Sequence, residues 1–273
     1  MQALCEIDNW DVPFATAGVT RAEATIATRG DAQRPLELAS VSKPVAALAT
    51  LVAAEEGVVD LDEPAGPPGS TVRHLLSHAS GLPFEGGTPI APPGRRRIYS
   101  NEGFLVLGAH LAERAEMPFA DYVREAVCVP LGIRLDPEGH PGAGMHACLD
   151  DVLALGRELL APTLVAPETH AEMVAVQFPG LDGVLPQFGR FSPLDWGLGV
   201  ELKGAKEPHW SGSLTSPATF GHFGGSGTFL WVDPTRDLAC AALTTRRFGD
   251  WAKAAWASLS DAVVREVRSA QPG

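Results

Sequence analysis

The sequence predicts a mixed α+β fold, in which one sheet is assembled from both ends of the chain and a helical segment lies between them. Alternating apolar residues, which are typical of strands, occur near the N-terminus and return from residue 196 onward. The intervening residues 44–186 show helical periodicity, interrupted by loops rich in Pro and Gly. Hydrophobic residues make up 45% and charged residues 20% of the 273 residues, as in soluble globular proteins. We therefore expect one domain, residues 1–273, with two lobes and one cleft.

The N-terminal part is expected to form a hairpin followed by a helix. Residues 14–20 and 24–29 alternate as strands do and are separated by a short polar turn. Pro44 is tolerated only in the first turn of a helix, so the next helix begins close to Ser40. The expected helices of the middle segment are residues 45–57, 72–78, 102–115, 119–127 and 150–160. Asp150 and Asp151 open the last of them, and we interpret them as capping residues.

The C-terminal part returns to strands and closes with an amphipathic helix. The expected strands are residues 196–202, 219–224, 228–232 and 238–244, and the helix covers residues 250–269. Because both ends contribute to one sheet, neither half is expected to fold alone. We assign residues 1–44 and 195–273 to an α/β lobe, and residues 45–194 to a helical lobe.

The charge pattern argues against nucleic acid and membrane partners. The formal net charge is −12, and the longest basic run is Arg95-Arg96-Arg97. The uncharged helical stretch at residues 44–54 is too short to cross a bilayer. Residues 1–10 lack the basic and apolar regions of a secretion signal, so we expect a cytoplasmic protein. The four cysteines are widely separated, which argues against a zinc or disulfide framework, and no metal or cofactor is implied.

Ser40 and Lys43 form the most informative pair in the sequence. Of the four lysines, only Lys43 has a serine three positions before it. Positions i and i+3 share one helix face, about 5 to 6 Å apart at Cβ, so the lysine can act as base to a serine nucleophile. The start of a helix favours an oxyanion at Ser40 and disfavours a charged lysine. Taken alone, the pair is more often an N-cap serine followed by a surface lysine.

Two further motifs carry polar side chains suited to the same chemistry. Tyr99 and Asn101 lie in a loop just before a helix, where a phenol beside a lysine can relay the proton that a serine loses. Residues 221–227 surround His222 with glycines, which let a substrate approach the backbone and leave an N–H free for an oxyanion hole. Taken alone, Tyr99 is more often a packing residue and a glycine-rich turn is usually a hairpin. The glycines match neither G-x-G-x-x-G nor the P-loop.

With these three motifs in order, the chain resembles the serine β-lactamase and penicillin-binding-protein superfamily, in its class C, esterase-like branch. That family carries S-x-x-K, then Y-x-N, then K-T-G or H-x-G. The corresponding residues here are Ser40/Lys43, Tyr99/Asn101 and His222/Gly224. The resemblance covers about residues 14–258. It implies a β-lactamase/transpeptidase-like fold, in which an antiparallel sheet flanked by helices packs against an all-helical lobe with the active site between them.

The resemblance also implies a role for each motif residue. Ser40 would attack a carbonyl, Lys43 and Tyr99 would handle the proton, and the backbone N–H groups of Ser40 and Gly225 would hold the oxyanion. His222 would assist Tyr99 or the leaving group. The residues expected to bind substrate are Asn101, Phe223, Gly224 and Ser226, and Asn101 would alternatively orient Lys43.

The third motif departs from Lys-Thr-Gly, because the chain has His222-Phe223-Gly224 instead. The cation and the hydroxyl that would bind a β-lactam carboxylate are both missing. Burying a carboxylate beside Phe223 without a partner is unfavourable in free energy. The pattern therefore favours an ester, amide or thioester over an anionic antibiotic. The segment before Phe14 is also short for the N-terminal helix of the family, so an edge of the sheet is expected to be bare or covered by a partner chain.

Other sites in the sequence have simpler interpretations. His74 and His78 have a zinc-ligand spacing, but Leu75 stands where the metalloprotease motif needs Glu, so packing is favoured. No G-x-S-x-G elbow occurs, which excludes an α/β-hydrolase. Scattered tryptophans are more often core residues, but we leave open whether three of them line a substrate pocket. These are Trp196, Trp210 and Trp231.

Four functions remain open at this stage. The first is a cytoplasmic serine hydrolase, monomeric or homodimeric, that cleaves a small-molecule ester or amide through an acyl-Ser40 intermediate. The second is an acyltransferase with the same intermediate, which a dry, Trp-lined pocket would favour. A weak β-lactamase or D-amino-peptidase is the third, and a non-catalytic binding module is the fourth.

Overall fold

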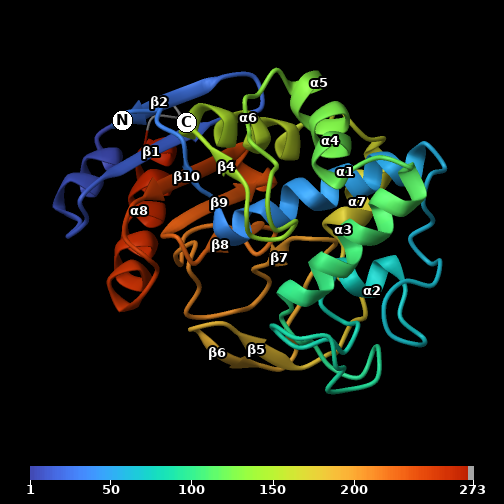
Figure 1. Ribbon diagram of the computed structural model, residues 1–273. Helices are drawn as coiled ribbons and strands as arrows, with labels where there is room; N and C mark the ends of the chain where they lie inside the picture. Colours follow the sequence, from blue (N-terminus) through green and yellow to red (C-terminus); the bar gives the residue numbers. More distant parts are fainter. Residues whose placement is uncertain (270–273) are drawn as a thin grey trace.

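A six-stranded antiparallel sheet forms the centre of the molecule (Figure 1). The computed structural model describes residues 1–269. Along the sheet the strands are β2 (Thr25–Arg29), β1 (Ala15–Thr20), β10 (Leu238–Thr244), β9 (Thr228–Asp233), β8 (Phe220–Gly224) and β7 (Glu201–Leu202). β1 pairs directly with β10, with Ala15 opposite Thr244. The prediction of one sheet built from both ends of the chain is therefore confirmed, as is the α+β fold class.

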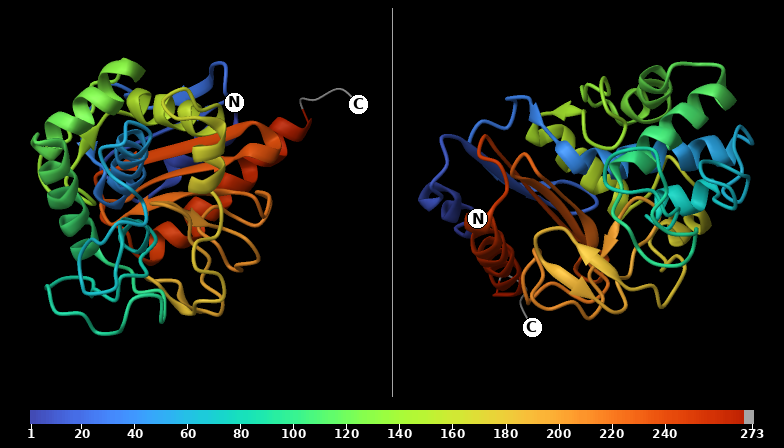
Figure 2. Two further views of the ribbon diagram at one scale, coloured as in Figure 1. Left: turned by 90° about the vertical axis from the view of Figure 1, so that its right-hand side faces the viewer. Right: turned by 60° about the horizontal axis from the view of Figure 1, so that its bottom comes forward.

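Helices cover both faces of the sheet (Figure 2). On one face lie α8 (Asp250–Ser269) and the short helix η1 (Ala3–Asn9), and the backbone N–H groups of Gln2 and Ala3 donate to Glu266 of α8. The other face is covered by α6 (Leu149–Leu160) and α1 (Ser42–Glu55). The short N-terminal segment thus packs beside α8, while β2 at the sheet edge is largely exposed.

The middle of the chain is mainly helical. Its remaining helices are α2 (Val72–Leu76), α3 (Asn101–Ala115), α4 (Phe119–Val123), the π-helix η3 (Arg124–Cys128), α5 (Val129–Leu131) and α7 (Pro167–Met173). Two small sheets pair β3 (Leu36–Glu37) with β4 (His146–Ala147), and β5 (Gly183–Leu185) with β6 (Gly189–Phe191). Two 3-10 turns, η2 (Ala39–Val41) and η4 (Pro234–Arg236), complete the chain.

The observed elements differ from the predicted ones in several places, and η1, α7 and the four strands of the two small sheets were not predicted. The strand expected at residues 196–202 shrinks to β7, and Trp196 forms only an isolated bridge to Glu201. The helix expected at residues 119–127 is divided between α4 and the π-helical turn η3, and the helical path continues beyond the expected range into α5. Helix α6 packs against β1, β9 and β10, although its residues lie within the segment assigned to the helical lobe. The division of the chain into lobes stays a prediction.

The buried side chain of Arg97 connects three loops near the site by hydrogen bonds. The Arg97 guanidinium donates to the backbone oxygens of Ser77 and Gln177, both at 2.6 Å, and of Leu194 at 3.1 Å. Only 2% of Arg97 is exposed, and this burial lowers the pKa of Arg97 to about 10. A cation that satisfies several buried carbonyls stabilises loops that have no regular secondary structure of their own.

Replacing Arg97 is expected to destabilise the protein strongly. Arg97→Met leaves three buried carbonyl groups without their donor, and we expect a loss of about 3 kcal/mol in the free energy of unfolding, measured by urea denaturation. Arg95→Met is the matched control, because Arg95 is exposed, and it is expected to change stability by less than about 0.5 kcal/mol. Equal stability of the two variants would show that the Arg97 contacts do not hold these loops.

Candidate active site

Ser40 lies in the tight turn η2, directly before α1. The turn is closed by the Val41 N–H, which donates to the backbone oxygen of Leu38 at 3.1 Å. Ala39 has a φ of 45°, in the left-handed region that residues other than glycine seldom adopt. The helix therefore begins close to Ser40, as predicted, and the backbone next to this serine is strained.

Gly224, at the end of β8, lies against the segment that precedes Ser40. A Cβ atom on Gly224 would lie 2.3 Å from the Leu38 oxygen and 2.4 Å from Thr228 Oγ1. Thr228 Oγ1 also donates to that Leu38 oxygen at 2.8 Å. Thr228 at the start of β9 is thus bonded to the turn of the first motif, and only glycine permits the approach of β8 to the same turn.

A continuous chain of hydrogen bonds links the first two motifs. The Tyr99 hydroxyl donates to Ser40 Oγ at 2.6 Å. Lys43 Nζ lies 3.2 Å from Ser40 Oγ on the other side. The amine also donates to Asn101 Oδ1 at 2.7 Å and to the Gly142 oxygen at 2.8 Å. Tyr99, Ser40, Lys43 and Asn101 are therefore brought together as the sequence predicted.

Lys43 is buried completely and pairs with no carboxylate in the described part of the chain. This burial lowers the pKa of Lys43 well below its usual value and favours the neutral amine. A neutral amine has two N–H donors, which match Asn101 Oδ1 and the Gly142 oxygen, and one lone pair. Ser40 can then donate its own proton to that lone pair while it accepts from Tyr99, and every polar group in the chain is satisfied.

The Tyr99 ring is held among aromatic neighbours. The His78 ring lies 4.6 Å away, the Trp196 ring 5.9 Å and the His222 ring 5.9 Å, measured between centroids. The apolar surroundings raise the pKa of Tyr99 above its usual value, and the hydrogen bond to Ser40 opposes this only in part. Tyr99 therefore remains a protonated phenol, able to donate, at neutral pH.

His222 is a buried, neutral histidine at the wall of the site. Burial lowers the pKa of His222 to about 3. Its Nδ1 lies 2.7 Å from the backbone oxygen of Phe223, so this nitrogen carries the proton and donates. The other nitrogen, Nε2, is then an acceptor, and it has no hydrogen-bond partner among residues 1–269.

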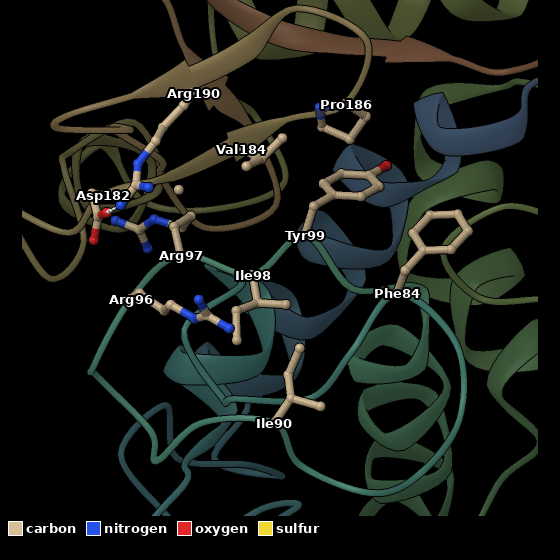
Figure 3. A pocket seen from close by; sticks show the side chains of 11 residues that line it. Phe84, Ile90, Arg96, Arg97, Ile98, Tyr99, Asp182, Val184, Pro186 and Arg190 are labelled. Atoms are coloured by element: carbon tan, nitrogen blue, oxygen red, sulfur yellow. Dashed lines mark hydrogen bonds and ion pairs between the residues drawn. The ribbon is translucent and has the colours of Figure 1, made fainter.

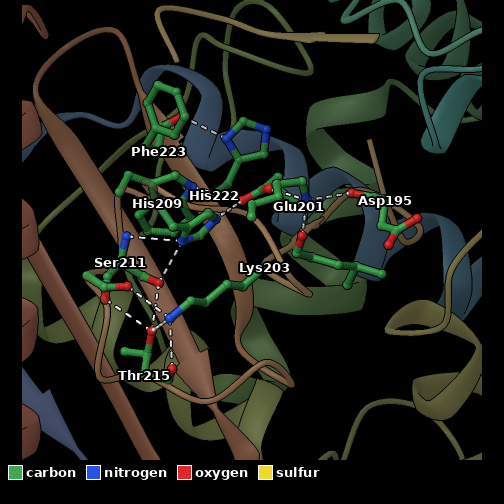
Figure 4. A network of polar contacts seen from close by, with 12 residues as sticks. Asp195, Glu201, Lys203, His209, Ser211, Thr215, His222 and Phe223 are labelled. Carbon is green, nitrogen blue, oxygen red and sulfur yellow. Dashed lines mark hydrogen bonds and ion pairs between the residues drawn. The ribbon is translucent and has the colours of Figure 1, made fainter. Parts of the chain in front are cut away.

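Glu201 lies beneath His222 in a buried polar network (Figure 4). Its carboxylate is 2.6 Å from Lys206 Nζ and 2.7 Å from His209 Nε2, and it accepts from Trp210 Nε1 at 2.8 Å. Burial alone would raise the pKa of Glu201, but His209 and Lys206 outweigh it and hold the pKa at about 2. The carboxylate is therefore engaged and is not a free base. Nothing in the sequence singled out Glu201.

Ser40 opens into a cavity of about 210 Å³, which we call the catalytic cavity. Its walls are largely aromatic and apolar, and its lining residues are Ser40, Phe84, Tyr99, Leu185, Pro186, Gln187, Trp196, Glu201, His222, Phe223, Gly225 and Phe248. Five of these were predicted site residues. The Ser226 hydroxyl lies outside the lining, 3.1 Å from Thr228 Oγ1. Leu185, Pro186 and Gln187 of the β5–β6 hairpin were not predicted as site residues, and neither was Phe248, because short loops carry no periodic signal.

The amides expected to form the oxyanion hole have no hydrogen-bond acceptor among residues 1–269. In the described residues, neither the Ser40 N–H nor the Gly225 N–H donates a hydrogen bond to another backbone or side-chain group. A Cβ atom on Gly225 would meet nothing within 4 Å, so the space beside this residue is open.

The remaining sequence candidates have structural partners. His74 Nδ1 lies 2.9 Å from Thr71 Oγ1, whereas His78 accepts from the Ser100 N–H at 3.1 Å, so the two histidines are engaged separately. No group of three or more His, Cys, Asp or Glu that could hold a metal occurs within residues 1–269. Among the three tryptophans, only Trp196 lines the catalytic cavity; the other two are core residues.

Comparison with known proteins agrees with this geometry. A family model described as Beta-lactamase matches residues 7–136 and 133–263. The chain belongs to the beta-lactamase family. It is an enzyme of the serine hydrolase type, within the superfamily that also contains the penicillin-binding proteins. No helix within residues 1–269 has the length and apolar character needed to span a membrane.

Individual members of the family show how far the likeness extends. The crystal structure of a beta-lactamase, Mb2281c, from Mycobacterium bovis is 50% identical, with a TM-score of 0.96 over 97% of this chain and 99% of that chain. Simvastatin synthase LovD from Aspergillus terreus shares the fold, with a TM-score of 0.80 and 18% identity over 98% of both chains. Penicillin-binding protein 4* of Bacillus subtilis is 29% identical over 143 residues, 37% of this chain and 32% of that protein. The chain thus matches less than half the length of its curated relatives.

A methyl group on Gly224 is expected to disable the site. In Gly224→Ala the new Cβ would displace the turn that carries Ser40, and we expect labelling of Ser40 by a fluorophosphonate to slow by about a hundredfold. Gly87→Ala is the matched control, because a Cβ atom there meets only Glu102 Oε1 at 3.8 Å and Gly87 lies outside the cavity lining, and it should label at nearly the wild-type rate. A folded Gly224→Ala protein that labels as fast as wild type would contradict this account.

Proposed function

We propose that the protein hydrolyses esters through an acyl-Ser40 intermediate. The observation that carries this proposal is the hydrogen-bond chain from Tyr99 through Ser40 to Lys43 and Asn101. It joins a hydroxyl nucleophile to a neutral amine on one side and to a protonated phenol on the other. A nucleophile in contact with both a base and an acid is the arrangement that acyl transfer requires.

Acylation follows from the proton positions in this chain. Ser40 Oγ attacks the carbonyl carbon while its proton passes to Lys43 Nζ, and the backbone N–H groups of Ser40 and Gly225 donate hydrogen bonds to the developing oxyanion. When the tetrahedral intermediate collapses, the bond to the leaving oxygen breaks and Tyr99 donates its proton to that oxygen. The Lys43 ammonium then returns a proton to the Tyr99 phenolate. Asn101 acts by holding Lys43 in place.

Deacylation uses the same groups in reverse. Water takes the place of the departed alcohol beside Tyr99, and its oxygen attacks the acyl carbon while one proton passes from the water to the Tyr99–Lys43 pair. The bond from the acyl carbon to Ser40 Oγ then breaks, and Lys43 returns that proton to Ser40 Oγ as the acid leaves. His222 Nε2 is a fixed acceptor in the wall of this cavity, which suits it to orient the water or the leaving alcohol. In this role His222 positions a reactant and does not itself exchange a proton, because its pKa of about 3 keeps it neutral.

The cavity favours a neutral acyl group over an anionic β-lactam. Trp196, Phe223 and Phe248 form much of its wall, and the only carboxylate in the lining, Glu201, is already paired. His222 is neutral where related enzymes carry a lysine, so nothing at this position compensates the burial of a substrate carboxylate.

Acyl transfer to an alcohol is a second candidate, supported by the aromatic lining. A cavity of about 210 Å³ with few polar groups favours an organic acceptor over bulk water. The chemistry is the same in both cases, because an alcohol that enters beside Tyr99 attacks the acyl-enzyme as water would.

The acyl-enzyme is testable by intact-protein mass spectrometry after incubation with p-nitrophenyl butyrate, a fluorophosphonate or a penicillin. We expect butyryl and phosphonyl adducts on wild type, no penicilloyl adduct, and no adduct on Ser40→Ala. Ser42→Ala is the matched control, because this neighbouring serine is buried and accepts from the Met145 N–H at 3.2 Å, and it should keep the adducts. A butyryl adduct that persists in Ser40→Ala would overturn the proposal.

A further inference from the structure

A second pocket adjoins the catalytic cavity and shares a wall with it. This outer pocket has a volume of about 490 Å³, within the range of small-molecule sites. Its lining residues are Phe84, Ile90, Arg96, Arg97, Ile98, Tyr99, Asp182, Gly183, Val184, Pro186 and Arg190 (Figure 3). Phe84, Tyr99 and Pro186 line both spaces. A molecule that reacts at Ser40 can therefore extend past Tyr99 into the outer pocket.

The outer pocket gathers apolar side chains that the fold leaves open to solvent. Phe84 is 49% exposed, Ile90 56% and Val184 57%. They account for three of the seven exposed large hydrophobic residues in the described chain, and they come from two segments distant in sequence. Exposed apolar side chains that converge on one concave site indicate a binding surface for an apolar group.

Among residues 1–269, Arg96 is the one arginine of the pocket that forms no hydrogen bond or ion pair, although at longer range its charge helps to lower the pKa of Asp182. Arg97 is occupied by backbone oxygens, and Arg190 is paired with Asp182. Arg96 is exposed and forms no ion pair with any residue in the described part of the chain. Figure 3 shows its guanidinium beside Ile98, on the side of the pocket where Ile90 lies. In a protein with a net charge of −12, this local excess of arginine favours an anion.

The position of Tyr99 between the two spaces determines which part of a substrate enters the outer pocket. Tyr99 donates to the oxygen of the leaving alcohol in the proposed reaction, so that oxygen must lie against Tyr99. The carbon chain attached to it then continues past Tyr99, on the side away from Ser40. The acyl group remains in the smaller catalytic cavity, among Trp196 and Phe223.

We propose that the outer pocket binds the alcohol part of the substrate, and that this alcohol has an apolar stem and an anionic end bound by Arg96. Phe84, Ile90 and Val184 contact the stem. A carboxylate or a phosphate satisfies the charge requirement equally, because both accept hydrogen bonds from a guanidinium. This inference rests on the proposed acyl-Ser40 chemistry and names the substrate class for it.

The test compares two esters that differ only at the end of the alcohol: hexyl butyrate and the butyrate ester of ε-hydroxycaproate. We expect wild type to show a kcat/KM about tenfold higher for the anionic ester, which corresponds to one guanidinium–carboxylate contact. Arg96→Gln should abolish this preference by lowering kcat/KM for the anionic ester about tenfold, to the level of hexyl butyrate in the same variant. Arg95→Gln is the matched control, since Arg95 is an exposed neighbour outside the pocket lining, and it should keep the preference.

Several outcomes would overturn the inference. Equal kcat/KM for the two esters in wild type, or a preference that survives in Arg96→Gln, would show that Arg96 does not bind the anionic end of the substrate. A preference for an anionic group placed on the acyl side, tested with ethyl hexanoate against monoethyl adipate, would show that the pocket holds the acyl chain instead. If neither ester yields a butyryl adduct on Ser40, the proposed function itself fails, whereas adduct formation without discrimination overturns only the substrate class.

Discussion

The burial of Lys43 without a counterion is the constraint on which the site depends. A lysine in apolar surroundings is stabilised as a neutral amine, because no carboxylate among residues 1–269 offsets the desolvation of its charge. The amine then needs two acceptors and one donor, and the structure supplies Asn101, Gly142 and Ser40 in these roles. The same burial that would be costly in a structural lysine makes this one a base for Ser40.

The fold brings these groups together from distant parts of the chain. Ser40 comes from η2 and Lys43 from the start of α1, Tyr99 and Asn101 come from the loop into α3 and its first residue, and His222 comes from β8. Gly224 allows the end of β8 to approach the turn of Ser40. Arg97 holds the loops at Ser77 and Gln177 in place by hydrogen bonds to their backbone oxygens. Because the sheet contains both ends of the chain, the nucleophile and the wall of its cavity form only when the whole domain folds.

Local patterns predicted the parts of the site that depend on spacing along the chain. Ser40, Lys43 and Pro44 specify a helix start with a nucleophile and a base on one face, and the structure contains that helix. The partner at Gly142 had no such signal, because any residue offers a backbone oxygen. Glu201 was missed for a related reason, since its partners His209 and Trp210 meet it only through tertiary contacts. The outer pocket rests on a loop and on the β5–β6 hairpin, whose strands are too short to show alternation.

The protonation state of Lys43 is the most direct test of this account. The NMR chemical shift of Lys43 Nζ, assigned by difference from Lys43→Arg, reports whether the group is an amine or an ammonium. We expect the shift of a neutral amine already at neutral pH, because burial keeps the pKa of Lys43 well below its usual value. An ammonium shift at neutral pH that titrates near the ordinary lysine pKa of about 10.4 would contradict the account.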